Sequence, residues 1–201
     1  MFHFHLIVLD LETTDCDEHA VIEVGAVALS PTLEELGRFR SLVRPDFPVS
    51  DFVVGLTGHS RESLAEAPEW PLVGEQFERW VVEVTGKPPN RSRLVAWGNY
   101  FDVTALRSQY RRHGLGYPFS GTALDAKTVA VLWAGLSGRR TDSLSVKRAA
   151  EWMGLEPEGP YHQALTDAVV TARIFRRAVE EIGGGVWIDR KYVRVGEVPS
   201  E

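Results

Sequence analysis

The sequence predicts an α/β protein in which helices lie on the faces of a mixed β-sheet. Two observations predict this class: three short apolar runs follow one another near the N-terminus, and helical periodicities alternate with short apolar runs over the remainder. The links between the first three runs are short, which favours an antiparallel meander. The alternation that follows adds strands to the same sheet and places helices on its faces.

The first three strands are predicted over residues 4–10, 21–29 and 38–43. The first contains Leu6-Ile7-Val8-Leu9, which is wholly apolar and therefore typical of a strand buried on both faces. The second run is apolar as well, whereas the third places charges among apolar residues. These runs therefore predict a meander with its most buried strands at the centre of a core.

Later elements are predicted from the spacing of apolar residues and from glycine and proline stops. Residues 45–71 are punctuated by proline and glycine and are expected to be a loop, with one or two helical turns over 60–67. We expect Asp142 or Ser143 to cap one of the later helices. Helices are predicted over 72–84, 102–113, 126–133, 143–153 and 164–182, and short strands over 94–97 and 123–125.

Length and composition predict one domain. The chain has 201 residues, of which 44% are hydrophobic and 25% charged, so it can bury a sizeable core. We expect a single domain over 1–201 with its core in 4–182, followed by a C-terminal tail or hairpin in 183–201. The one cysteine, Cys16, cannot form an internal disulfide, which favours a reducing, cytoplasmic setting. Neither a signal peptide nor a membrane-spanning run is expected.

The net charge of −6 restricts the class of function. It argues against a protein that grips long duplex nucleic acid through a broad basic face. It is compatible with an enzyme that takes a strand end into a cleft lined by metal ions. Four ionised carboxylates in such a cleft would account for much of the negative charge, and two divalent cations would cancel it locally.

Asp10 and Glu12 are the most informative residues of the chain. They follow the first apolar run, and residues two apart in a strand point to the same side. Two carboxylates would therefore lie together at the edge of a dry core, where unpaired charge is costly and like charges resist joint ionisation. Divalent cations would remove both penalties, so the pair predicts the start of a metal site.

Asp102 and Asp167 are two further candidate carboxylates. Asp102 stands at a predicted strand-to-helix transition, where it could cap the helix or could point towards the first two carboxylates. Asp167 lies inside the last predicted helix among small and apolar neighbours, where a solvated surface charge is not expected. The alternative for Asp167 is an ion pair with Arg173 or Arg176.

His162 precedes Asp167 by five residues. Positions five apart do not lie on one face of a helix, so His162 is expected in the loop or the first turn before it. From there its imidazole could turn towards the carboxylates. The alternative is a surface or hydrogen-bonded histidine, the interpretation that we give to the remaining histidines, which lack a comparable acidic context.

Taken together, these residues resemble one known pattern. Asp10-x-Glu12, Asp102 and His162-x-Ala164-x-x-Asp167 occur in the order found in the DEDD family of 3′-to-5′ exonucleases, in the branch with a catalytic histidine (DEDDh). This branch includes ribonuclease T, oligoribonuclease and the proofreading subunit of bacterial DNA polymerase III. The middle motif, Trp97-Gly98-Asn99-Tyr100-Phe101-Asp102, departs from the replicative branch, and with Leu56-Thr57-Gly58 upstream it is more similar to the exoribonucleases.

The resemblance covers roughly residues 4–182 and implies a ribonuclease H-like fold. In that fold a five-stranded mixed sheet, with its first three strands antiparallel, is flanked by helices. By motif position, the four acids would hold two Mg²⁺ or Mn²⁺ ions, for which carboxylate oxygens are suitable ligands. Asp10 would be shared between the ions, and His162 would take a proton from the attacking water. The implied product is a 5′-mononucleotide released from the 3′ end.

The resemblance also implies contacts to the substrate. Glu12, Thr13 and His162 stand where the family holds the terminal nucleotide, and Leu56 stands where an apolar side chain contacts the last base. Phe101 and its aromatic neighbours could stack on bases, although core packing is the alternative for them.

The favoured function is a metal-dependent 3′-to-5′ exonuclease on single-stranded ends, with RNA or short oligonucleotides preferred over DNA. The alternatives are a proofreading-type exonuclease acting on DNA and an inactive nucleic-acid-binding module on the same fold. The expected partners are therefore single-stranded RNA or DNA 3′ ends, without a membrane. Only analogy with relatives suggests a homodimer.

Overall fold

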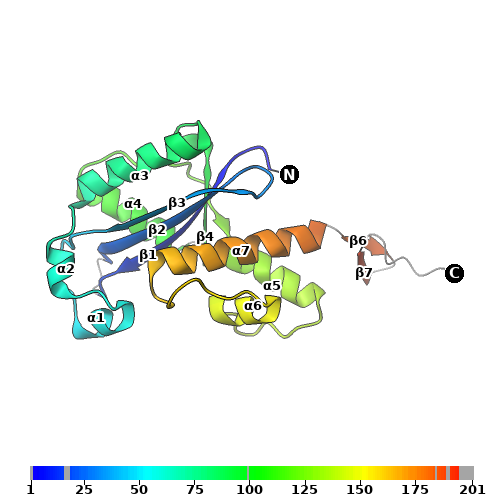
Figure 1. Cartoon of the computed structure of the whole chain (residues 1–201). Helices are drawn as coiled ribbons and strands as arrows, with labels where there is room; N and C mark the ends of the chain where they lie inside the picture. Colours follow the sequence, from blue (N-terminus) through cyan, green and yellow to red (C-terminus); the bar gives the residue numbers. More distant parts are fainter. Residues whose placement is uncertain (1, 16–18, 99, 184, 189–190, 195–201) are drawn as a thin grey trace.

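A five-stranded mixed sheet forms the centre of the computed structural model, in the order β3-β2-β1-β4-β5 (Figure 1). β1 pairs antiparallel with β2, β2 pairs antiparallel with β3, and the pairs β1–β4 and β4–β5 are parallel. The predicted fold class and the antiparallel meander are therefore confirmed. The strands are β1 (Leu6–Thr13), β2 (Val21–Leu29), β3 (Glu35–Leu42), β4 (Arg93–Ala96) and β5 (Leu124–Asp125).

The structure describes residues 2–15, 19–98, 100–183, 185–188 and 191–194, and for the last two ranges the backbone alone. Seven α-helices and one short 3₁₀ helix are found among these residues. They are α1 (Asp51–Thr57), α2 (Arg61–Ala65), α3 (Trp70–Thr85), η1 (Pro89–Arg91), α4 (Asp102–Arg112), α5 (Ala126–Leu136), α6 (Val146–Met153) and α7 (Ala164–Gly183).

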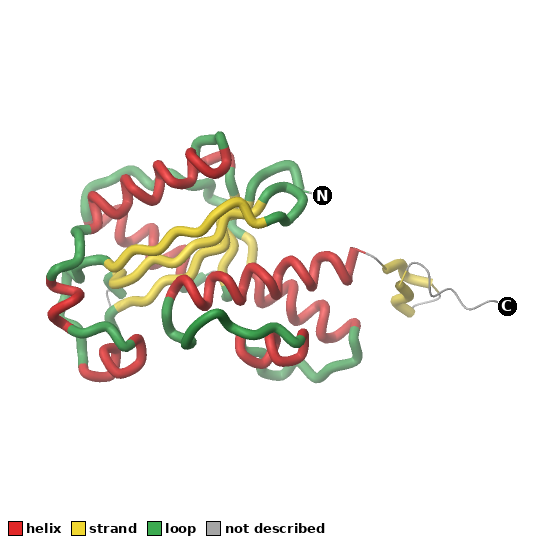
Figure 2. Tube along the Cα trace, viewed as in Figure 1, coloured by secondary structure: helices red, strands yellow, loops and turns green. Residues whose placement is uncertain are grey.

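Alternation along β1 separates two cores. Ile7, Leu9 and Leu11 pack with apolar residues of α3 and α4 on one face of the sheet. Leu6 and Val8 point to the other face and pack with residues of α5 and α7. Figure 2 shows α3 and α7 on opposite sides of the strands. Because side chains two residues apart point to the same side of a strand, positions 10 and 12 also face α7.

Gly25 allows α7 to lie very close to this face. It stands opposite Asp10 in the β1–β2 pairing. A Cβ atom at Gly25 would lie 2.1 Å from the carbonyl carbon of Ala164 and 2.2 Å from the nitrogen of Leu165. Such an approach between two backbones requires a residue without a side chain. The first turn of α7 is thereby placed against the strands next to Asp10.

Several elements differ from those predicted, and three of the differences have a clear physical cause. Helix α1 was not predicted, because the segment is short and surrounded by proline and glycine; its N-cap, Ser50, accepts a hydrogen bond from the Val53 nitrogen. Helix α6 begins at Val146, three residues later than predicted, because Ser145 provides the cap rather than Asp142 or Ser143. The third strand begins at Glu35, earlier than residue 38, because its outer residues are exposed and lack an apolar signal.

After α7, the backbones of β6 (Gly185–Ile188) and β7 (Lys191–Arg194) pair antiparallel in a separate two-stranded sheet. This agrees with the hairpin alternative for these residues, whereas 195–201 lie outside the described residues. The single-domain boundaries stay a prediction. No helix in the described ranges combines the length and the apolar character needed to cross a membrane.

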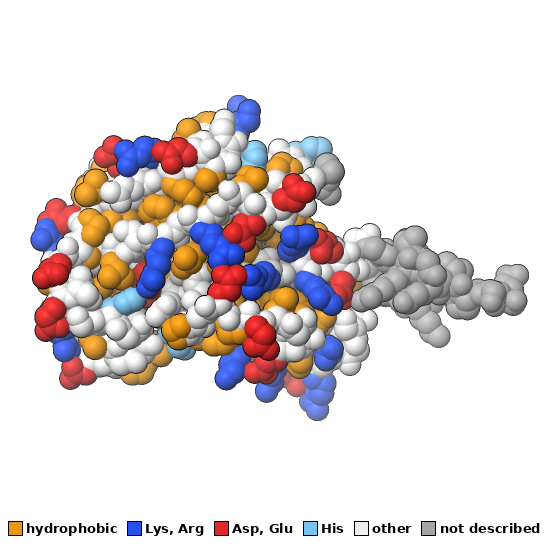
Figure 3. All heavy atoms as spheres, in the orientation of Figure 1, with side chains coloured by type: hydrophobic (Ala, Val, Ile, Leu, Met, Phe, Trp, Pro, Cys, Tyr) orange, Lys and Arg blue, Asp and Glu red, His pale blue; other side chains and the backbone are white. Residues whose placement is uncertain are grey.

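Charges of both signs are mixed on the face that carries α7 (Figure 3). The arginines of this helix are paired with glutamates: Arg173 with Glu158, and Arg176 with Glu180. The face in view thus offers no broad basic surface, in line with the negative net charge.

Candidate functional site

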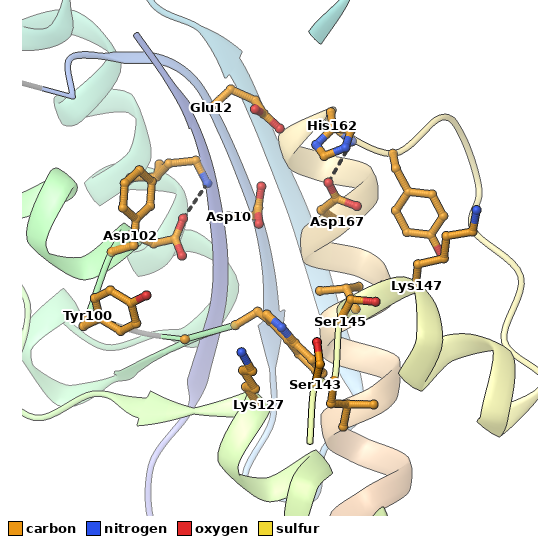
Figure 4. A pocket seen from close by; sticks show the side chains of 17 residues that line it. Asp10, Glu12, Tyr100, Asp102, Lys127, Ser143, Ser145, Lys147, His162 and Asp167 are labelled. Atoms are coloured by element: carbon orange, nitrogen blue, oxygen red, sulfur yellow. Dashed lines mark hydrogen bonds between the residues drawn. The ribbon is translucent and has the colours of Figure 1, made fainter. Parts of the chain in front are cut away.

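A cavity of about 780 Å³ opens at the carboxyl end of the central strands. It lies where β4 stops at Ala96 while β1 continues to Thr13, so the two strands no longer pair there. Its walls come from the end of β1, from the segment between β4 and α4, and from the starts of α5, α6 and α7 (Figure 4). Residues from remote parts of the sequence therefore meet in one place.

Asp10 and Glu12 line this cavity from β1. They continue the face of Leu6 and Val8, so both carboxylates point towards the side on which α7 lies. Burial raises the pKa of Glu12 to about 8, and the nearby carboxylates add to this effect. Burial, followed by the charge of Asp102, also raises the pKa of Asp10 well above its usual range. Both groups resist ionisation as they stand.

Asp102 reaches the cavity from the first residue of α4. Its Oδ1 accepts a hydrogen bond from the Leu11 nitrogen at 3.1 Å (Figure 4). The position of the helix cap belongs to Phe101, so the capping interpretation of Asp102 is wrong. Burial raises the pKa of Asp102 to about 7, although the hydrogen bond from Leu11 opposes this shift.

Asp167 lies in the first turn of α7 and is 8% exposed. One oxygen, Oδ2, accepts a hydrogen bond from the backbone nitrogen of His162 at 2.8 Å. The other oxygen, Oδ1, is buried and has no hydrogen-bond partner among the described residues. The ion pair considered for Asp167 does not form, because Arg173 and Arg176 pair with Glu158 and Glu180. Burial raises the pKa of Asp167 as well.

His162 stands in the loop before α7, as predicted, and its side chain is exposed. Its φ of 64° lies in the left-handed region, which residues other than glycine seldom adopt. Strained residues of this kind occur often at functional sites. Three possible ligand atoms lie within 4.8 Å of one another, one from each of Glu12, His162 and Asp167. The imidazole is therefore adjacent to the carboxylates and still open to solvent.

The donor set fits divalent cations. Four carboxylates with raised pKa values line one cavity, and one buried oxygen of Asp167 has no hydrogen donor among the described residues. An unsatisfied buried acceptor is costly and calls for an ion or a water. Hard cations such as Mg²⁺ and Mn²⁺ prefer oxygen ligands. Asp10, Glu12, Asp102 and Asp167 could hold such ions.

Of the three remaining contact residues predicted from the sequence, one lines the cavity and two do not. Phe101 lines the cavity, is 38% exposed, and meets the ring of His19 edge-on at 5.0 Å. Thr13 ends β1, and Leu56 is 39% exposed in α1. Neither Thr13 nor Leu56 belongs to the residues that line the cavity in the described part of the chain.

Glu23 is a residue that the sequence interpretation missed. It stands opposite Glu12 in β2 and is fully buried. Its carboxylate accepts hydrogen bonds from Arg40 at 2.6 Å and from the Ala164 nitrogen at 3.1 Å, and it lies 2.8 Å from the imidazole of His59. The bond to Ala164 ties the N-terminus of α7 to the sheet. A charged residue inside an apolar strand was the available signal.

Lys127, Ser143 and Ser145 also line the cavity and were not predicted to do so. They belong to α5 and to the segment that precedes α6. No local pattern marks them, because only the folded chain brings these segments next to β1.

Comparison with known proteins assigns a family. The family profile RNase_T, described as exonuclease, matches residues 7–175. The chain is 28% identical over 179 residues to the DNA polymerase III PolC-type of Caldanaerobacter subterraneus subsp. tengcongensis, covering 88% of this chain and 12% of that protein. It is 24% identical over 177 residues to the DNA polymerase III subunit epsilon of Haemophilus influenzae, covering 84% of this chain and 65% of that protein. The chain thus spans less than two thirds of either relative.

Two solved structures share the fold. The nuclease domain of 3′hExo, a DEDDh family member bound to rAMP, superposes with a TM-score of 0.73 at 23% identity and covers 89% of this chain and 93% of that chain. A 3′-exonuclease that recognises the histone mRNA stem-loop gives a TM-score of 0.76 at 21% identity, covering 100% and 74%. The family suggested by the motifs is confirmed: because the matching profile extends over most of its length, this chain belongs to the RNase_T exonuclease family.

Proposed function

We propose that this chain is a 3′-to-5′ exonuclease that uses two divalent cations. It would hydrolyse the last phosphodiester bond of single-stranded nucleic acid and release 5′-mononucleotides, with RNA or short oligonucleotides preferred over DNA. One observation carries this proposal: four carboxylates and one exposed imidazole gather around a single cavity, and a buried oxygen of Asp167 has no partner among the described residues.

Different sets of carboxylates would hold the two ions. By motif position, Asp10, Glu12 and Asp167 would hold the ion nearer the attacking water, Asp10 would be shared, and Asp102 would serve the second ion. When bound, such a pair of ions stabilises both the entering and the leaving oxygen of an in-line displacement at phosphorus. The hydrogen bond from Leu11 keeps the Asp102 carboxylate turned towards the cavity.

His162 would act as the general base. Its ring lies beside Glu12 and Asp167 and is open to solvent, so it can take a proton from the attacking water and pass it to bulk water. The hydrogen bond from its backbone to Asp167 holds the loop in place while the side chain stays exposed to solvent.

Contacts to the terminal nucleotide would come from Glu12, His162 and Phe101, which line the cavity. The exposed ring of Phe101 could stack on a base, a contact that tolerates any sequence. Thr13 and Leu56 stay candidates by motif position. A homodimer and a cytoplasmic setting likewise stay predictions.

The preference for RNA has a competing alternative. The nuclease domain of 3′hExo was solved with rAMP, which favours RNA, whereas the relatives among the DNA polymerases favour a DNA-directed, proofreading-type enzyme. An inactive module that only binds nucleic acid is the second alternative, and the presence of all four acids and the histidine argues against it.

A degradation assay with Mn²⁺ tests the proposal. End-labelled RNA, single-stranded DNA and duplex DNA are compared, each labelled at the 5′ or the 3′ end. We expect a 5′ label to give a ladder of shortening strands and a 3′ label to appear at once as a mononucleotide. Fragments that shorten from the 5′ end would contradict the assignment, and rates on RNA and DNA decide between the two substrate classes.

Titration calorimetry with Mn²⁺ separates the enzyme from an inactive module. An enzyme of the proposed kind should show Mn²⁺ binding that is lost in Asp10→Ala, whereas an inactive module should show no acid-dependent site. The variant Asp46→Ala, which removes a carboxylate that lies apart from the cavity next to His113, is the matched control.

A further inference from the structure

Lys127 is a cation inside the candidate site that has no counter-ion in the described part of the chain. It stands in the first turn of α5 and lines the cavity. Figure 4 shows its side chain directed into the cavity, at the end opposite Glu12 and His162. Its backbone nitrogen donates to Asp125 Oδ1, and its ammonium group forms no ion pair with a carboxylate among the described residues. It is therefore available to an anionic ligand.

The nearest carboxylate in sequence, Asp125, is already used. Its Oδ1 accepts hydrogen bonds from the nitrogens of Lys127 and Gly98, each at 2.9 Å, and its Oδ2 accepts one from Thr128 at 2.8 Å. Asp125 thus caps α5 and ties it to the segment that carries Asp102. This arrangement fixes the base of the Lys127 side chain at the wall of the cavity.

Two hydroxyl groups belong to the lining of the same cavity. Ser143 and Ser145 line the same cavity as Lys127, and Figure 4 draws all three side chains below the carboxylates. The oxygen of Ser145 caps α6 by accepting from the Arg148 nitrogen at 3.2 Å, which leaves its hydroxyl proton free to donate. An ammonium, two hydroxyls and the start of a helix are the groups that recognise phosphate oxygens.

We propose that Lys127, Ser143 and Ser145 bind the backbone phosphate that lies one link to the 5′ side of the bond being hydrolysed. The proposal rests on the proposed function. In a strand that ends in a 3′-hydroxyl, the terminal nucleotide carries no phosphate other than the one under attack. Any further phosphate in the cavity must therefore belong to the neighbouring nucleotide. The subsite would let a chain of net charge −6 hold a polyanion without a broad basic surface.

Substrates with one neutral linkage test this subsite. A short oligo(dT) is compared with the same strand carrying a methylphosphonate at the linkage next to the scissile bond, and with one carrying it several links away. In the unmodified protein the adjacent methylphosphonate should raise KM about tenfold, the loss of one charge-assisted contact, and leave kcat nearly unchanged. In Lys127→Ala this penalty should disappear, and in Lys127→Arg it should return.

The matched control is Lys87→Ala, an exposed lysine after α3 that does not line the cavity. It should keep the full penalty of the adjacent methylphosphonate. The slope of log KM against log salt should fall by about 0.7 in Lys127→Ala and stay the same in Lys87→Ala. An unchanged methylphosphonate penalty in Lys127→Ala overturns the subsite, even if the variant binds all strands more weakly.

Binding measured without turnover keeps this test separate from that of the proposed function. Fluorescence anisotropy of the same labelled strands, in Ca²⁺ and at low salt, compares the unmodified protein with Lys127→Ala. If Lys127→Ala loses the methylphosphonate penalty on affinity, the subsite is supported even for a protein that hydrolyses nothing. If hydrolysis is normal and the penalty is unaltered in Lys127→Ala, the proposed enzyme stands and the subsite is excluded. Equal affinity of the unmodified protein for all three strands overturns it too.

Discussion

Two buried carboxylates, Glu23 in β2 and Asp167 in the helix packed against that sheet, have opposite surroundings. Glu23 is bonded to Arg40, to the Ala164 nitrogen and to His59, so the protein itself neutralises it. Asp167 receives one backbone hydrogen bond, and its second oxygen has no partner among the described residues. The difference teaches that burial alone does not mark a functional acid. The acid proposed to bind a cation is the one for which the fold provides too few hydrogen-bond donors.

The same contrast separates two histidines. His59 is 8% exposed and lies against Glu23, whereas His162 is exposed at the rim of the cavity. His59 would therefore hold the structure together, and His162 would act on a ligand. The predictions below test whether the two regions divide stability and chemistry in this way.

The largest effect is expected for the carboxylates of the cavity. Asp10→Ala and Asp167→Ala should each lower kcat by roughly 10³-fold or more, because several kcal/mol of stabilisation by the cations is lost. The metal-free variants should melt no lower than the unmodified protein, since like charges are removed. Steady-state hydrolysis and calorimetric melting measure the two quantities. Full activity in either variant would remove the metal-site assignment.

The two histidines give the next largest effects, one on kcat and the other on the stability of the fold. His162→Ala should lower kcat by about 10²-fold with Mn²⁺ binding preserved, the usual loss on removing a general base. His59→Ala should destabilise the fold and retain kcat in the folded fraction. Measured kcat values, with unfolding monitored by circular dichroism, distinguish the pair. Unchanged kinetics in His162→Ala would exclude its role as base.

Glu23→Gln should lower the free energy of unfolding by about 2 kcal/mol, because a fully buried carboxylate that accepts hydrogen bonds from Arg40 and from the Ala164 nitrogen is replaced by an amide with a single acceptor oxygen. Urea denaturation measures this loss. The matched control is Glu69→Gln, which removes an exposed ion pair with Arg44 and should cost less than about 0.5 kcal/mol. Equal losses in the two variants would mean that Glu23 is no more structural than a surface charge.

A smaller effect is expected from pH in the metal-free protein. Folding raises the pKa of Glu12 from 4.5 to about 8 and that of Asp102 from 3.8 to about 7. The folded state therefore binds more protons than the unfolded state between those values, so these groups reduce stability as the pH rises. The melting temperature should fall by roughly 5 °C between pH 5 and pH 8.

Added Mg²⁺ should reverse this trend, because cations compete with protons for the same oxygens and bind the ionised site more tightly at higher pH. The control is Glu12→Gln, in which the pH dependence should be smaller. A melting temperature that rises with pH in the absence of metal would contradict the raised pKa values.

The sequence predicted the parts of the molecule that depend on repeated apolar spacing. The apolar run Leu6–Leu9 and the stripe along 164–182 located β1 and α7, which carry Asp10, Glu12 and Asp167. Helix α1 was missed because seven residues contain too few apolar repeats. Lys127 was missed because no local pattern marks it: only the fold brings the start of α5 next to β1. Glu23 was missed although a charge inside an apolar strand was a signal, because its partners Arg40, His59 and Ala164 are distant in the chain.

Gly25 also sets the distance between the two elements that carry the candidate ligands Asp10 and Asp167. The strand with Asp10 and the helix with Asp167 are held at a fixed separation by direct contact between two main chains, where one extra methyl group has no room. A chain with alanine at position 25 would retain every candidate ligand and proton acceptor, and yet hold them too far apart to bind the proposed pair of ions. The missing Cβ atom of Gly25 thus controls the distance between these side chains and not which side chains are present.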